Sequence, residues 1–260
     1  MRKTMYRLLI ELTNNKAIST LLMKFSRSKI SRHIIPSYMK VYKLKMEEAN
    51  GKKEDYKTLH DLFTRTLLPG MRPVGSDPAS VVSPVDGILE DYGTIEADKN
   101  IIVKEKRYSI EEMLGNKKEL EKYIGGSYMI IYLSPSHYHR IHSPISGNVT
   151  GRWSLGKNSY PVNRMGLKYG KAPLSKNYRV VTELANERGH IAVVKVGAMF
   201  VNSIEMTNRH DHLQKGEEFS YFSFGSTVVL LFEKGTFQLD RDAGMHREVK
   251  VGECLGHLIK

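Results

Sequence analysis

Cysteine is almost absent from this chain of 260 residues, because Cys254 is the only one. A single thiol excludes an intramolecular disulfide framework and a cysteine-rich metal site, and it fits a reducing compartment such as the cytosol. Long apolar runs are also missing, since no stretch approaches the ~20 residues needed to span a bilayer. With 40% hydrophobic residues, the chain can still bury a real core, and we expect one globular unit.

Acidic residues are scarce in the first 45 positions, where Glu11 alone stands against eleven basic residues. Eleven minus one gives this segment a net charge of +10, out of +12 for the whole chain. A segment so basic favours a polyanionic partner, which means either nucleic acid or an anionic lipid surface.

Apolar residues in the same segment recur at helical spacing, in two sets: Met5, Leu8, Leu9 and Leu12, then Ile18, Leu21, Leu22 and Phe25. Two amphipathic helices with basic neighbours are typical of an interfacial segment, so we predict contact with an anionic membrane and not with nucleic acid. The alternative is that both stripes pack on the protein's own core. The segment is also similar to a mitochondrial transit peptide, but it continues through residues 38–44 without a processing boundary, which favours a mature bacterial N-terminus.

Secondary structure is expected to change along the chain. A short helix over 56–63 is stopped by Pro69-Gly70, and a second one over 109–114 has Ser109 as N-cap and Glu112 completing a capping box. Elsewhere, from Val81 onward, strands are predicted over 87–95, 127–133, 147–153, 179–184, 190–201, 226–232 and 246–258. The fold class is therefore α+β, with N-terminal amphipathic helices in a basic region, 1–68, followed by a β-rich, sandwich- or barrel-like catalytic core, 69–260.

Three places combine polar residues with apolar surroundings. Asp86 stands in a turn before an apolar run, where a carboxylate is most often structural. A histidine-rich segment follows the strand predicted over 127–133 and contains His137, His139, Arg140 and His142. It has no cysteine or carboxylate at ligand spacing, so it favours proton transfer over zinc binding. The third place, Gly225-Ser226-Thr227, would by itself be a turn leading into a buried strand.

These three places have a chemistry in common. A serine hydroxyl becomes a nucleophile when a neighbouring base takes its proton, and a histidine held by a carboxylate is such a base. The glycine before Ser226 lets the chain adopt the strained approach that attack on the Gly225 carbonyl requires.

The ordered segments around Asp86, 138–142 and 225–227 resemble the phosphatidylserine decarboxylase family. Further stretches are similar to that family, at 63–65, 69–73, 108–110, 186–188, 196–198, 203–205 and 215–218, so the resemblance covers most of residues 60–235. The family usually has leucine where this chain has Phe224. Both residues are large and apolar, so we expect a changed pocket wall and retained cleavage.

The resemblance implies a precursor that cleaves itself. In the family's roles, Asp86 orients His142, His142 activates Ser226, and the Ser226 hydroxyl attacks the Gly225 carbonyl to form an ester. Elimination then separates a large chain, 1–225, from a small chain, 226–260. Loss of ammonia converts residue 226 into a covalent pyruvoyl cofactor.

The resemblance also implies the reaction that follows. The pyruvoyl ketone is expected to form a Schiff base with phosphatidylserine and to accept electrons as carbon dioxide leaves, giving phosphatidylethanolamine for phospholipid biosynthesis. The proton would return from His139 or His142, and no metal is expected. Arg140 is expected either to hold the lipid phosphate or to form a salt bridge within the protein.

The implied partners are the phosphatidylserine substrate and an anionic membrane surface. The large and small chains are expected to stay associated, and a second copy is expected to complete a homodimer. The expected location is the cytoplasmic face of a bacterial cell membrane. Three alternatives stay open. The chain is a pyruvoyl-dependent decarboxylase of a soluble amino acid, a serine hydrolase using Asp86, His142 and Ser226, or a non-enzymatic module that tethers another molecule to anionic membranes or RNA.

Overall fold

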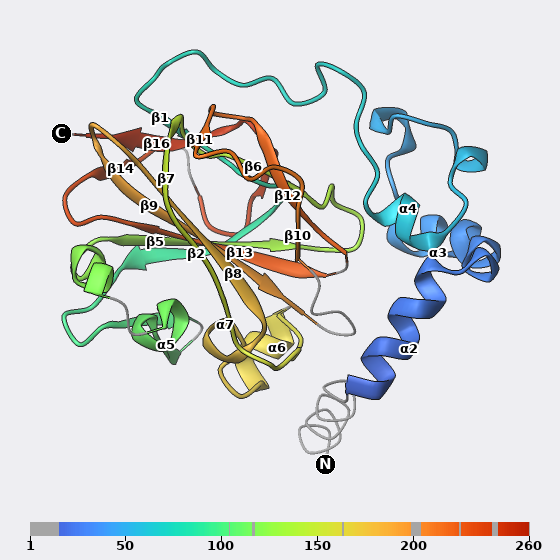
Figure 1. The fold of residues 1–260 in the computed structure, drawn as a ribbon, viewed down its shortest axis with the longest axis horizontal. Coiled ribbons are helices and arrows are strands. Elements are labelled where there is room, and N and C mark those ends of the chain that lie inside the picture. Colours follow the sequence, from blue (N-terminus) through green and yellow to red (C-terminus); the bar gives the residue numbers. More distant parts are fainter. Residues whose placement is uncertain are drawn as a thin grey trace.

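The computed structural model describes residues 16–103, 105–115, 118–162, 164–198, 204–223, 225–240 and 244–259. Helices before residue 64 form a lobe at one end of the molecule (Figure 1). They are α2 (Lys16–Arg27), η1 (Lys29–Ile34), α3 (Ile35–Tyr42), η2 (Met46–Glu48), η3 (Lys53–Asp55) and α4 (Leu59–Phe63). The helices of the remainder are α5 (Ile110–Leu114), η4 (Lys118–Tyr123), α6 (Arg164–Tyr169) and α7 (Pro173–Lys176).

The core is built on one antiparallel sheet of eight strands in the order β11-β7-β8-β9-β13-β5-β2-β15. Their bounds are β2 (Gly87–Thr94), β5 (Ser127–Leu133), β7 (Gly147–Leu155), β8 (Arg179–Asn186), β9 (Gly189–Gly197), β11 (His212–Leu213), β13 (Ser226–Phe232) and β15 (Glu248–Val249). Three small sheets accompany it. They contain β1 (Ser80–Val82), β16 (Cys254–Leu258) and β14 (Phe237–Leu239); β10 (Ile204–Met206), β12 (Glu218–Phe222) and β6 (Arg140–His142); and β3 (Asn100–Val103) with β4 (Lys106–Ser109).

Strand β13 explains why the sequence shows a continuous apolar run. Side chains of a strand alternate between faces, and both faces of this sheet are covered. Val228 and Leu230 enter a core shared with residues of the two three-stranded sheets, whereas Val229 and Leu231 enter the core on the opposite face, which includes residues of α5 and α7. Burial on both faces leaves no position in this strand for a solvent-exposed polar residue.

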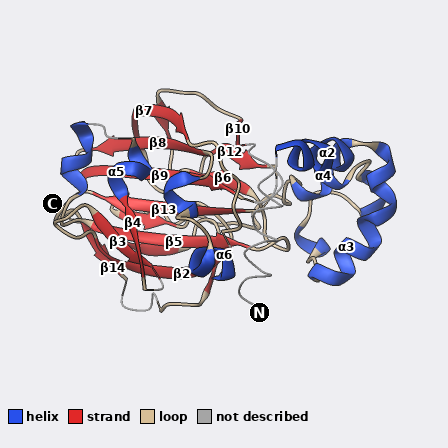
Figure 2. Ribbon diagram, turned by 90° about the horizontal axis from the view of Figure 1, so that it is seen from below, coloured by secondary structure: helices blue, strands red, loops and turns tan. Residues whose placement is uncertain are grey.

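The helical lobe has a small core of its own, made by Ile35, Tyr56, Leu59 and Leu62. Figure 2 shows this lobe beyond one end of the strands, joined to the β core by loops. Hydrogen bonds connect the lobe to the β6 strand and the loop before it. Tyr38 Oη donates to Pro135 O at 3.0 Å, Arg65 Nη2 donates to Ser136 O at 2.9 Å, and Arg140 Nε donates to Thr64 O at 3.0 Å. The lobe therefore holds the histidine-rich segment.

The predicted α+β class with a β-rich core is confirmed. Strands β5 and β13 have the predicted bounds, and Ser109 caps α5 by accepting a hydrogen bond from Glu112 N at 3.1 Å. The single strand predicted over 246–258 is wrong, because β15 and β16 are separated by a turn in which Gly252 has a φ of 86°. The apolar stripe of residues 5–12 lies outside the described residues, and the division at 68/69 stays a prediction.

Candidate active site

His142 lies in β6, where its ring is hydrogen-bonded at both nitrogens. Nδ1 lies 2.7 Å from Gly216 O, and Nε2 lies 3.1 Å from the hydroxyl of Tyr138. A carbonyl only accepts, so Nδ1 carries the proton and Nε2 presents the lone pair to the tyrosine. Burial lowers the pKa of His142 and raises that of Tyr138, so the imidazole is held neutral and the phenol protonated. His142 therefore has the protonation state of a base.

Asp86 precedes β2 and is engaged by an arginine. Arg72 donates from Nε to Oδ1 at 2.8 Å and from Nη2 to Oδ2 at 2.5 Å, and Val251 N donates to Oδ1 at 3.0 Å. Within the described residues, no hydrogen bond joins Asp86 to His142, although the Asp86 carboxylate is near enough to favour a higher His142 pKa. The predicted orienting role of Asp86 stays a prediction.

Ser226 is the first residue of β13 and is completely buried between Gly197 of β9 and Leu133 of β5. Its Oγ has no hydrogen-bond partner in the described structure. An unpaired buried hydroxyl costs about 1–3 kcal/mol, so one that persists is a candidate functional group. The carbonyl of Gly225 accepts a hydrogen bond from Ala198 N at 3.1 Å, which polarises the carbonyl that the Ser226 hydroxyl is expected to attack. Phe224 lies outside the described residues.

His139 is the histidine that contacts the strand end opposite Ser226. Its Nε2 lies 3.1 Å from Ser134 O, and Ser134 follows Leu133, which is the cross-strand partner of Ser226. The ring stacks on Phe63 with centroids 3.9 Å apart. Nε2 carries the proton because a carbonyl only accepts, so Nδ1 is a buried lone pair without a partner in the described part of the chain. Burial holds its pKa well below the ordinary value.

Arg140 has the salt bridge that the sequence offered as one of two alternatives. Its Nη1 lies 2.7 Å from Glu218 Oε1, and the guanidinium lies 5.6 Å from the centre of the Tyr221 ring. These contacts hold the side chain of Arg140, a residue of β6, against β12.

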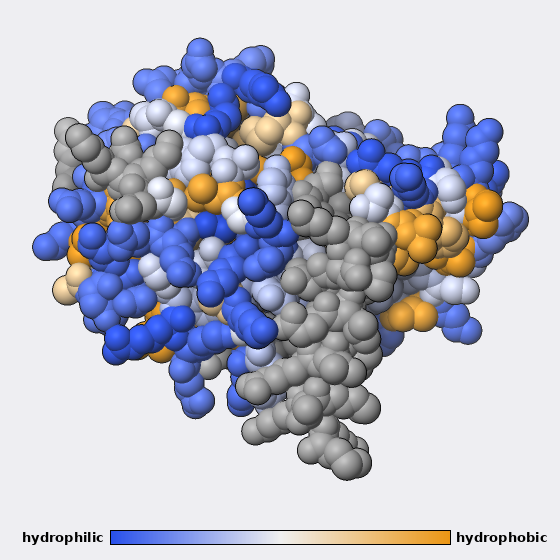
Figure 3. Space-filling view, turned by 60° about the horizontal axis from the view of Figure 1, so that its bottom comes forward, coloured by the Kyte–Doolittle hydropathy of each residue, from blue (hydrophilic) through white to orange (hydrophobic). Residues whose placement is uncertain are grey.

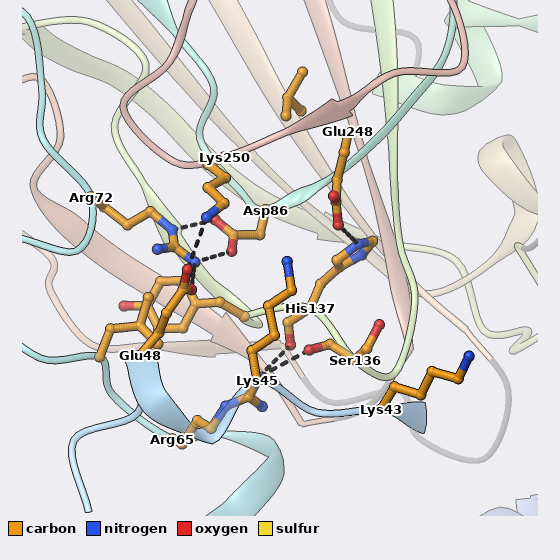
Figure 4. Close-up of a pocket in the computed structure, with 13 residues that line it drawn as sticks. Lys43, Lys45, Glu48, Arg65, Arg72, Asp86, Ser136, His137, Glu248 and Lys250 are labelled. Carbon is orange, nitrogen blue, oxygen red and sulfur yellow. Dashed lines mark hydrogen bonds and ion pairs between the residues drawn. The ribbon is translucent and has the colours of Figure 1, made fainter. Parts of the chain in front are cut away.

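A cavity of about 70 Å³ is lined by residues of the helical lobe on one side and by residues near Asp86 and Tyr138 on the other. Asp86 and Tyr138 belong to its wall, so it borders the groups that surround His142. Figure 4 shows Lys45 reaching into this space, with the Arg72–Asp86 pair on one side and His137 on the other. The remaining lining residues are Lys43, Glu48, Arg65, Leu67, Ser136, Glu248, Val249 and Lys250.

Comparison with known proteins identifies the family. The family model described as phosphatidylserine decarboxylase matches residues 59–257. This chain belongs to the phosphatidylserine decarboxylase family. It is 60% identical to a phosphatidylserine decarboxylase proenzyme of Anoxybacillus flavithermus, over 99% of this chain and 97% of the relative. It is 56% identical to a proenzyme of the same name from Bacillus thuringiensis subsp. konkukian, over 97% of each chain. The family predicted from the sequence is confirmed.

Three residues of this family member are part of the site although sequence reasoning gave them no role. Arg72 and Gly216 lie in stretches similar to the family, and Tyr138 lies in the histidine-rich segment. Their contacts to Asp86 and His142 join residues as far as 74 positions apart, as in the pair His142 and Gly216. The one available signal was that these stretches resemble the family, since spacing along the chain carries no information about such contacts.

Proposed function

We propose that this chain is a phosphatidylserine decarboxylase proenzyme that cleaves itself between Gly225 and Ser226. The observation that carries the proposal is the completely buried, unpartnered Oγ of Ser226 beside a Gly225 carbonyl held by Ala198 N, in a chain of this family. The Ala198 N–H would stabilise negative charge on the Gly225 oxygen as the hydroxyl attacks. A neutral imidazole, of His142 by the family's roles, takes the proton of that hydroxyl.

Cleavage conserves every atom except one nitrogen and its hydrogens. The Ser226 oxygen bonds to the Gly225 carbonyl carbon as the peptide C–N bond breaks, which gives an ester and a free amine. Elimination across Cα and Cβ of residue 226 releases Gly225 as a carboxylate. Water then replaces the nitrogen, ammonia leaves, and a ketone stays at the new N-terminus of 226–260.

The surroundings of Ser226 fit a pyruvoyl group formed from that residue. Among the described residues, apart from Gly225 and its chain neighbours, no atom lies within 4 Å of a Cβ built on Gly225. The pyruvoyl ketone supplies an electron sink for decarboxylation. Of the two histidines, His139 is the better candidate to return the proton to the product, because its ring contacts Ser134, one residue from the partner of Ser226.

We propose that the protein acts at a membrane surface. Large apolar side chains of the helical lobe face solvent: Leu21, Leu22, Phe25, Ile30, Ile34, Val41 and Tyr42. Figure 3 shows apolar residues gathered on this lobe next to strongly hydrophilic ones. Exposed basic residues lie along the same segment, namely Lys24, Arg27, Lys29, Arg32 and Lys40. Apolar side chains with adjacent cations support peripheral binding to anionic lipid, on the cytoplasmic face of a bacterial membrane. No helix in the described part of the chain is long and apolar enough to cross a bilayer.

The intact mass of the denatured protein tests this function. We expect two chains, 1–225 and 226–260, with the small one lighter than a serine-started peptide by one ammonia. Purified protein should then release carbon dioxide from phosphatidylserine in vesicles and none from free serine. Ser226→Ala protein should stay as one full-length chain and be inactive. A wild-type chain that stays intact after prolonged incubation would contradict the proposal and favour a serine hydrolase or a tether.

A further inference from the structure

The cavity beside Tyr138 has more positive than negative side chains. Five cationic residues line it, Lys43, Lys45, Arg65, Arg72 and Lys250, against three carboxylates, Glu48, Asp86 and Glu248. Each carboxylate already has a partner. Glu48 binds Arg72 and Lys250, Asp86 binds Arg72, and Glu248 lies 3.3 Å from His137. The excess of positive charge therefore resides on the other three cations.

Lys43, Lys45 and Arg65 have no carboxylate partner within the described residues. The ammonium groups of Lys43 and Lys45 make no hydrogen bond or ion pair there. Arg65 is only 5% exposed, its Nη atoms donate to backbone carbonyls of residues 62, 136 and 137, and its Nε is buried without a partner. A buried guanidinium without a counter-charge is costly unless an anion completes the site.

The cavity has the size and the position expected of a site for a phosphate group. One water needs ~10–15 Å³ of such space, so the cavity has room for a few waters or for a phosphate group. Figure 4 shows the Lys45 side chain extending between the Arg72–Asp86 pair and His137, and Lys43 at the edge of the cavity with its ammonium group turned outward. Lys43 follows the exposed apolar residues Val41 and Tyr42, and Tyr138, which also lines the cavity, binds His142. The cavity therefore connects the proposed membrane face with the reaction site.

We propose that Lys45, Lys43 and Arg65 bind the phosphate group of the phospholipid substrate. This inference rests on the proposed function. The phosphodiester enters from the membrane side, Lys45 and Lys43 pair with its oxygens, and the buried Arg65 supplies the fixed positive charge behind them. A headgroup held in this way has its serine portion directed toward the wall that carries Tyr138 and Asp86.

Kinetics with a soluble substrate separate this site from membrane electrostatics. The mature enzyme is assayed on dihexanoyl phosphatidylserine below its micelle concentration, without vesicles. For Lys43→Gln/Lys45→Gln we expect KM to rise about tenfold, with a much smaller change in kcat. The control is Lys53→Gln/Lys57→Gln, which removes two exposed charges of the same lobe that belong neither to the cavity wall nor to the proposed lipid-binding residues, and it should leave KM unchanged. An equal KM for the two double variants would overturn the proposal.

Inorganic phosphate gives a readout that does not require decarboxylation. Calorimetric titration should show phosphate binding to the wild-type protein that weakens about tenfold in Lys43→Gln/Lys45→Gln and stays unchanged in the control. In the kinetic assay, phosphate should inhibit competitively. Noncompetitive inhibition would mean a separate site for free phosphate and would overturn the assignment to the substrate. If the protein decarboxylates nothing, the titration alone still decides whether these lysines bind an anion.

Discussion

The hydroxyl of Tyr138 lies 3.1 Å from Nε2 of His142, the nitrogen that would take the proton of Ser226. With Nδ1 donating to Gly216 O, this tyrosine is the group that occupies the basic lone pair in the uncut chain. Self-cleavage therefore requires the two side chains to separate, or the hydroxyl to relay the proton. The two rings are tilted with their centroids 5.7 Å apart, so the phenol lies within reach of the imidazole for such a relay.

Tyr138→Phe is expected to shift the pH dependence of self-cleavage upward. Cleavage needs neutral His142, so the rate rises as pH increases through the pKa of that residue, which burial holds below its ordinary value. The tyrosine stabilises the neutral ring by donating to its lone pair, so its removal should raise the midpoint by about 0.5–1 pH unit. The rate is followed in freshly translated protein by the appearance of chain 226–260. Tyr42→Phe, at an exposed tyrosine, is the control, and a shared midpoint would refute the assigned hydrogen bond.

Asp86→Asn should destabilise the protein through Arg72. The side chains of this ion pair are 9% and 8% exposed, so removing the carboxylate charge leaves a buried guanidinium with Glu48 as its one carboxylate partner among the described residues. We expect about 3 kcal/mol less free energy of unfolding, most of it recovered in Arg72→Met/Asp86→Asn. Urea denaturation in a Ser226→Ala background compares chains that are all uncut.

The same pair of variants separates the structural role of Asp86 from its predicted catalytic role. In chains that retain Ser226, both Asp86→Asn and the double variant should stay uncut if Asp86 supports His142. Cleavage restored together with stability would assign Asp86 to the fold alone.

The sequence predicted those parts of the fold that depend on local pattern. The run 226–232 and the N-cap at Ser109 were found because a continuous apolar run and a capping residue are patterns that extend over only a few residues. It did not predict that Asp86 accepts from Val251 N, a contact between residues 165 positions apart. The order of the strands likewise depends on contacts between residues far apart in the sequence. Apolar content alone could not show that residues 246–258 form two strands, β15 and β16, in different sheets.

The candidate site shows the same limit. Ser226 was singled out as a hydroxyl before an apolar run and given its predicted role by the resemblance to the family, and His139 and His142 were singled out because they cluster in sequence. Their different surroundings, a buried pocket against Phe63 for one and a hydrogen bond from Tyr138 for the other, come from the packing of the helical lobe on the loop before β6. No spacing rule could have ranked the two histidines.

Lys195→Met should stabilise the protein at neutral pH. Lys195 is completely buried, donates to Thr182 Oγ1 at 2.7 Å and lies 4.6 Å from the centre of the Phe219 ring. Burial holds its pKa well below the ordinary value. The unfolded state therefore binds more protons than the folded state, and stability rises with pH up to the unfolded pKa of about 10.4.

Methionine has no titratable group, so Lys195→Met abolishes the proton uptake that accompanies unfolding. We expect a gain of about 2 kcal/mol at pH 7 that shrinks as the pH approaches 10. Chemical denaturation at pH 7 and pH 9.5 measures both effects. A variant less stable than wild type at pH 7 would mean that the amine contributes favourably to the core.

Leu21→Ser/Val41→Ser should weaken binding to anionic vesicles about tenfold, since these side chains are 68% and 71% exposed and would enter the lipid interface. Sedimentation with vesicles measures the effect, and residual binding should decrease as salt is raised. Ile102→Ser is the matched control, because Ile102 is 46% exposed on β3, away from the helical lobe (Figure 2). Equal binding by both variants would place the membrane contact elsewhere.

Lys43→Gly should separate the stability of α3 from the binding of phosphate. Lys43 ends this helix in the left-handed conformation, with a φ of 50°, and its N–H donates to Met39 O. A residue with a Cβ costs about 1 kcal/mol there relative to glycine. Lys43→Gly should therefore raise the free energy of unfolding by about that amount while weakening phosphate binding. Lys43→Gln should weaken binding equally without the gain in stability, because it loses the charge and keeps the strain. If both variants bound phosphate as tightly as wild type, Lys43 would be only a helix end, and the anion would depend on Lys45 and Arg65.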